Sequence, residues 1–167
     1  MNDIESLSTI AQVSMALTGF AGLLTAFRRR QSGWSAIEIF AIRDLLVASV
    51  CACLFALLPM PLLESGLSAE TVWAICLPIL GLSLLLLIAW SQRERFRAQI
   101  RPRRPIIYWG LTALGLATSL LLVSAIFGGP ESASPAYYLL GLGWLLLIAM
   151  VQFLLQILES LAATDKR

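Results

Sequence analysis

Five long apolar stretches, separated by short polar connections, constrain the fold of this chain more than any other feature. A helix needs about 20 apolar residues to cross the hydrocarbon core of a bilayer. The composition agrees, because 59% of the residues are hydrophobic and only 13% are charged, which is unusual for a soluble domain. We therefore predict an all-α integral membrane protein, a five-helix transmembrane bundle that forms one domain over residues 1–167. The predicted spans are residues 7–27, 37–58, 72–90, 106–127 and 136–158.

The basic residues are confined to three parts of the chain. Their positions are Arg28, Arg29, Arg30 and Arg43, then Arg93, Arg95, Arg97, Arg101, Arg103 and Arg104, and finally Lys166 and Arg167. Loops rich in lysine and arginine stay on the cytoplasmic side of a membrane. The N-terminus and the connections that follow the second and fourth spans carry acidic residues instead. We expect the N-terminus outside and the C-terminus in the cytoplasm.

Local signals set some helix boundaries. Ser35 and Glu38 have the spacing of a capping box, which predicts a helix beginning near residue 36. Pro59 lacks an amide donor and should end that helix. Ser134 followed by Pro135 is the favoured order of N-cap and first helical residue, so the last helix should begin there.

Two short segments resemble parts of small bacterial membrane proteins. One is the Thr-Gly-Phe-Ala-Gly sequence of residues 18–22, which arginines follow, and the other is the Leu-Leu-Pro sequence of residues 57–59. The resemblance implies the bacterial cytoplasmic (inner) membrane, with several spans. It carries over no functional residue.

The sequence offers little catalytic or metal-binding chemistry. It contains no histidine, which excludes serine–histidine and cysteine–histidine nucleophiles and most zinc and haem sites. Cys51, Cys53 and Cys76 all fall within predicted spans and are interpreted as small packing residues. We expect no enzyme, no metal and no cofactor.

The first span carries a pattern of small and polar residues. Ser14, Thr18, Gly22 and Ala26 recur every fourth residue, and Ser8, Gln12 and Gly19 lie beside them. Small residues let helix backbones approach closely in lipid, so close helix packing is one interpretation. The other is the lining of a pore in a homo-oligomer, where hydroxyl-bearing and small residues face water.

The second span contains the charged pair Arg43 and Asp44. At about 1.5 Å per residue the pair lies roughly 7–9 Å deeper than Glu38, where charges should face protein or water. Gln152 and Gln156 lie on one face of the fifth span at a matching depth. We predict a buried polar cluster of these four residues. It is either an ion, substrate or proton site, or a structural pair in which Arg43 extends toward the headgroups.

The loop after the third span contains six arginines. Each basic residue near an anionic membrane surface contributes about 1 kcal/mol of binding, so contact with anionic lipids is expected from Arg93, Arg95, Arg97, Arg101, Arg103 and Arg104. Nucleic-acid binding would need aromatic partners for the bases, and the loop offers only Phe96. We expect a lipid bilayer as the partner and no nucleic acid.

Two classes of function remain open. The first is a homo-oligomeric ion channel or pore lined by the first span. The second is a non-catalytic accessory or scaffold subunit that binds another membrane protein through its small-residue helix faces. A ring of protomers around a water-filled axis favours the channel, and a monomer favours the accessory role.

Overall fold

The structure is a computed structural model that describes residues 3–28, 36–99, 105–128 and 134–164. These residues form helices and contain no strand. Five of the helices are long and apolar enough to cross a membrane, which confirms the expected all-helical protein with five candidate spans. The long helices are α1 (Asp3–Arg28), α2 (Ala36–Leu57), α4 (Ala69–Ala98), α5 (Pro105–Gly128) and α6 (Pro135–Thr164), and the short helix is α3 (Pro59–Glu64).

Two helices begin where the sequence predicts, although Ser35 of the predicted capping box lies outside the described residues. α2 begins at Ala36, and α6 begins at Pro135, where the amide of Ala136 donates to Ser134 Oγ at 3.3 Å. α2 ends before Pro59, but Leu58 keeps helical dihedral angles and its amide donates to Leu54 O at 3.0 Å. The chain therefore continues through α3 in the helical direction, and the candidate span is longer than predicted, Ile39–Glu64.

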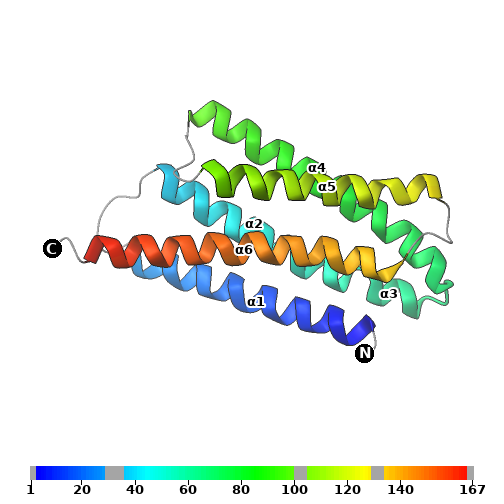
Figure 1. Ribbon diagram of the computed structural model, residues 1–167. Coiled ribbons are helices and arrows are strands. Elements are labelled where there is room, and N and C mark those ends of the chain that lie inside the picture. The colour runs from blue at the N-terminus through cyan, green and yellow to red at the C-terminus, as the bar shows by residue number, and fades with distance from the viewer. Residues whose placement is uncertain (1–2, 29–35, 100–104, 129–133, 165–167) are drawn as a thin grey trace.

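Two antiparallel helix pairs flank α6. α1 packs on α2, and α4 packs on α5, while α6 contacts all four of these helices (Figure 1). α1 begins and α6 ends at opposite ends of the bundle. The end at which α2 begins and α4 ends is called the arginine end below. This arrangement leaves α1 at the edge of the protomer, with one face on α2 and α6.

The core runs through the bundle and contains buried apolar side chains from all five long helices. Its fully buried members include Leu77, Leu80, Leu122, Tyr138 and Leu142. Glycine permits the closest contacts between these helices. A Cβ atom on Gly81 of α4 would lie 2.8 Å from Leu122 Cβ of α5, closer than real side chains pack.

Candidate functional site

The four-residue stripe of the first span does not stay on one face of α1. Ser14 is 0% exposed, Thr18 is half-buried, and Gly22 and Ala26 are exposed. The cause is helix geometry. A turn takes 3.6 residues, so each four-residue step advances the position by about 40° around the axis. Over three steps the stripe rotates by about 120°, from the bundle interior to the outside.

A different set of residues forms one side of the uncovered surface of α1, which also exposes Val13, Ala16, Phe20 and Leu23. Steps of four and three residues alternate along it, which keeps the set on one side of the helix. We call it the α1 outer face, and it consists of Ser8, Gln12, Met15, Gly19, Gly22 and Ala26. Ser8 is half-buried and the others are exposed. A Cβ atom on Gly19 or Gly22 would meet nothing within 4 Å, so both glycines are open to a neighbouring molecule.

Hydroxyl groups of α1 are satisfied within the helix. Ser14 Oγ donates to Ile10 O at 2.7 Å, and Thr18 Oγ1 donates to Ser14 O at 2.9 Å. Because Ser14 is also buried inside the protomer, it cannot line a pore between protomers. Of the polar residues predicted along the first span, Gln12 is the one whose side chain is exposed with no hydrogen bond among the described residues.

The charged pair of α2 contacts α4 at the arginine end. Asp44 Oδ2 accepts a hydrogen bond from Ser91 Oγ at 3.2 Å and lies 4.0 Å from Arg95 Nη2. Arg43 Nη1 lies 3.4 Å from Glu94 Oε2. The ion pairs join the two helices, and the Asp44–Arg95 pair is the more buried, since both side chains are 13% exposed.

Three aromatic rings alternate with the two arginine side chains. The Arg43 guanidinium lies 4.5 Å from the Trp90 ring centroid and 5.0 Å from that of Phe40. Arg95 lies 4.5 Å from the Phe40 centroid and 4.1 Å from that of Tyr108. The order Trp90–Arg43–Phe40–Arg95–Tyr108 is a continuous stack, which we call the arginine–aromatic stack. It connects α2, α4 and α5 and holds each guanidinium against electron-rich ring faces.

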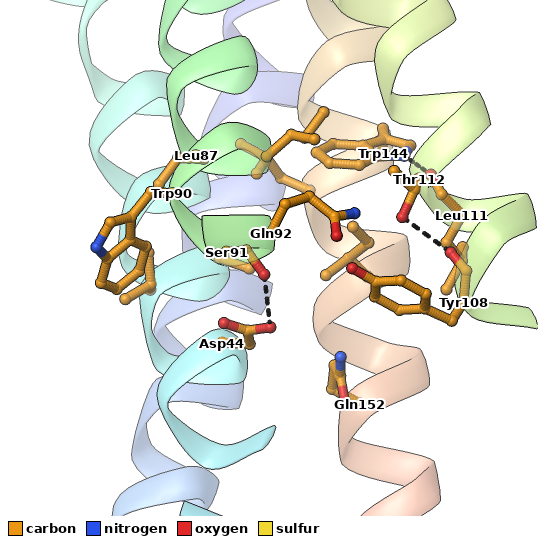
Figure 2. Close-up of a pocket in the computed structure, with 15 residues that line it drawn as sticks. Asp44, Leu87, Trp90, Ser91, Gln92, Tyr108, Leu111, Thr112, Trp144 and Gln152 are labelled. Atoms are coloured by element: carbon orange, nitrogen blue, oxygen red, sulfur yellow. Dashed lines mark hydrogen bonds between the residues drawn. The ribbon is translucent and has the colours of Figure 1, made fainter. Parts of the chain in front are cut away.

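A cavity of about 90 Å³ lies beside this stack, between α2, α4, α5 and α6. Figure 2 shows Gln92, Tyr108 and Gln152 directed toward the same space, with Asp44 at its edge. The Tyr108 hydroxyl is buried beside the Gln92 and Thr112 side chains and makes no well-aligned hydrogen bond. The lining residues are Asp44, Val47, Ala48, Leu87, Ile88, Trp90, Ser91, Gln92, Tyr108, Leu111, Thr112, Trp144, Leu145, Ile148 and Gln152.

The predicted four-residue cluster is divided in the structure. Asp44 and Gln152 line the same cavity. Arg43 is turned toward Glu94 and Trp90 and does not line it. Gln156 is buried, and its Nε2 has no hydrogen-bond partner, but it also lies outside the cavity wall.

The arginines of the predicted lipid-contact loop differ in their surroundings. Arg93 and Arg97 are exposed at the end of α4. Arg95 is directed inward to Asp44 and the arginine–aromatic stack. The other predicted lipid-contact residues lie outside the described part of the chain, and they are Arg101, Arg103 and Arg104.

Sequence reasoning missed the α4 residues that complete this region. Ser91 and Arg95 are four residues apart and continue the buried face of α4 that contains Leu77, Leu80 and Leu84. That periodicity was a usable signal that Arg95 points inward. Phe40 and Tyr108 carried no comparable signal, since their role depends on which helices are neighbours.

Comparisons with family models, with curated proteins and with solved structures find no match to this chain.

Proposed function

We propose that the protein is a homo-oligomeric ion channel or pore of the bacterial cytoplasmic membrane, in which the α1 outer faces surround the central axis. The N-terminus is outside and the C-terminus is cytoplasmic. Both arginine-rich connections follow helices that end at the arginine end of the bundle, and this supports that orientation by the positive-inside rule. Anionic lipids of the cytoplasmic leaflet contact the exposed Arg93 and Arg97.

The position of Gln12 carries the proposal. It lies eight residues from the start of the candidate span Ile4–Leu23, or about 12 Å along the helix axis. An exposed carboxamide at this depth would face hydrocarbon in a single protomer, where it finds no hydrogen-bond partner. A second copy of the chain in the same membrane has the same orientation and presents the same amide at the same depth. Because an amide both donates and accepts, Gln12 is complementary to its own copy.

The open backbone of α1 makes such an approach feasible. Gly19 and Gly22 lie on the same outer face as Gln12, and no neighbouring atom fills the space above either. Small residues of this kind allow helices to come close in lipid, where packing and interhelical hydrogen bonds drive association. In a ring of protomers the amide side chains would gather around the axis as the polar part of a pore.

The accessory or scaffold role is the second candidate, and the chemistry of the α1 surface supports it. The hydroxyl groups of Ser14 and Thr18 donate hydrogen bonds to backbone carbonyls of their own helix. Exposed residues next to Gln12 are apolar, with Val13 40% and Met15 67% exposed. Such a surface also suits dry packing against a transmembrane helix of another protein.

Conductance measurements on two neighbouring variants test the channel. Gln12→Leu removes the amide and keeps a similar volume, so we expect the single-channel conductance of the purified protein in planar bilayers to fall severalfold. Met15→Leu changes an apolar residue on the same face and should leave conductance unchanged. Conduction that is equal in wild type and Gln12→Leu would remove α1 from the pore, and the absence of any conduction by the wild type would favour the accessory role.

A further inference from the structure

The cavity between α2, α4, α5 and α6 is separate from the α1 outer face, because no α1 residue lines it. We propose that this cavity is a binding site for a small organic cation, a primary ammonium compound with a short apolar body. This inference is independent of the oligomeric channel. It depends on the charge, the unused hydrogen-bonding groups and the size of the cavity.

The charge of the wall selects a cation. Asp44 is the one charged residue among those that line the cavity. Its Oδ2 atom contacts Ser91 and Arg95, while Oδ1 has no hydrogen bond among the described residues. Neither Arg43 nor Arg95 is part of the wall, and both are held in the arginine–aromatic stack. Asp44 therefore contributes its carboxylate to the cavity wall, while the two guanidinium groups lie outside the wall.

The uncharged polar groups match the donors of an ammonium group. The buried Tyr108 hydroxyl makes no well-aligned hydrogen bond, and the carboxamides of Gln92 and Gln152 are directed toward the same space (Figure 2). An ammonium group has three N–H donors in a rotatable head. The Asp44 carboxylate, the Tyr108 oxygen and one carboxamide oxygen are together sufficient acceptors. A buried hydroxyl without a well-aligned hydrogen bond is costly, so occupation of the site would relieve that cost.

The size and the remaining lining restrict the apolar part of the ligand. Most of the wall consists of aliphatic and aromatic side chains, among them Leu87, Leu111, Trp144 and Ile148. A dry cavity of about 150 Å³ is known to hold benzene, and this cavity has about 90 Å³. A ligand with a chain of a few carbon atoms fits, and n-butylammonium is the probe of choice. This combination of an apolar wall with a few converging polar groups is typical of small-molecule sites.

Charged thiol reagents test the proposal in the full-length protein. Cys51, Cys53 and Cys76 are first replaced by alanine, and Thr112→Cys then places one thiol in the cavity. The Thr112 hydroxyl bonds its own helix at Tyr108 O, so the proposed ligand does not use it. The rates of modification by 2-aminoethyl and 2-sulfonatoethyl methanethiosulfonate are measured in nanodiscs and divided by the rates for free mercaptoethanol. Ile148→Cys is a second reporter from α6, and Met150→Cys, on the exposed side of α6, is the control outside the cavity.

We expect the cationic reagent to be favoured about tenfold at both cavity positions, the effect of one nearby carboxylate in a partly hydrated site. Asp44→Asn should bring the ratio close to one, and Asp44→Glu should restore it. Millimolar n-butylammonium should slow the reaction, while n-butanol at the same concentration should not. A lack of reaction in the cavity, a ratio near or below one with Asp44 present, or equal protection by n-butanol would each overturn the proposal.

Discussion

At the scale of single residues, two buried aromatic side chains join helices through their polar atoms. Tyr138 of α6 donates its hydroxyl hydrogen to Phe55 O of α2 at 2.6 Å. Trp144 of α6 donates its indole N–H to Leu111 O of α5 at 3.3 Å. Each ring is buried in the core, so the hydrogen bond and the packing act together. These two residues fix the position of α6 relative to both helix pairs.

Replacing Tyr138 with phenylalanine removes the first of these bonds and leaves the ring in place. We expect Tyr138→Phe to lower the free energy of unfolding by about 1 kcal/mol, the net value of one hydrogen bond. Tyr137→Phe is the matched control, because Tyr137 is next in the sequence and its side chain is 43% exposed. Denaturation by sodium dodecyl sulfate in mixed micelles, followed by circular dichroism, gives both values. An equal loss in the two variants would mean that the bond to Phe55 does not stabilise the protein.

Replacing Gly115 with alanine tests the contact between α5 and the Trp144 ring. A Cβ atom there would lie 2.1 Å from a carbon of that ring, so the ring or the helix must move. We expect Gly115→Ala to cost about 1–3 kcal/mol of stability, as overpacking does. A Cβ atom added at Gly110 of the same helix would have no neighbour within 4 Å. Gly110→Ala should therefore be neutral or stabilising by up to about 1 kcal/mol. The same denaturation by sodium dodecyl sulfate gives the stability of both variants. A Gly115→Ala variant that is more stable than the wild type would contradict the close packing of Gly115 on the Trp144 ring.

At the scale of helices, the arginine–aromatic stack joins α2, α4 and α5 at the arginine end. Phe40 is its central ring and lies between Arg43 and Arg95. Phe40→Leu removes the ring contacts with both arginines. It should lower the free energy of unfolding by about 1–2 kcal/mol, because the contact with the partly exposed Arg43 adds less than the contact with the buried Arg95. Ile39→Leu, at an exposed neighbouring position, should have no effect. If both variants unfold at the same detergent concentration, the stack does not hold the three helices together.

The helices themselves were predictable from the sequence, because apolar length and proline positions are local signals. α6 begins at Pro135 as expected, and α2 ends before Pro59. The four-residue spacing of Arg95 from Ser91 was enough to predict that Arg95 points inward. Their common partner, Asp44, could not be predicted in this way, because it is far away in the sequence. A one-dimensional pattern does not tell which helices become neighbours.

The prediction for the first span shows the same limit. The four-residue repeat from Ser14 to Ala26 resembles a single stripe in the sequence, but the helix turns it from the interior to the surface. The residues that do share the outer face, such as Gln12 and Gly19, were placed only beside the stripe. Which side of α1 is free depends on α2 and α6, and their positions are a property of the packed bundle.

At the scale of the whole molecule, α1 is a peripheral helix with one face on the bundle and one face uncovered. It packs on α2 and α6, while its outer face presents Gln12 and two open glycines. We propose that copies of the chain cover this face by packing their α1 helices against one another. The cavity beside Asp44 lies in each protomer, so its ligand binding should survive the loss of oligomer contacts through α1.

The subunit count of the protein in lipid nanodiscs, measured by native mass spectrometry, distinguishes an oligomer assembled through α1 from a single five-helix bundle. We predict a single closed oligomer of about four to six copies with cyclic symmetry, in which the α1 outer faces surround the axis. Gln12→Leu should shift it to smaller species, and Met15→Leu should not. A wild-type protein that is monomeric in nanodiscs would contradict the α1-lined pore, and the outer face would then belong to another membrane protein.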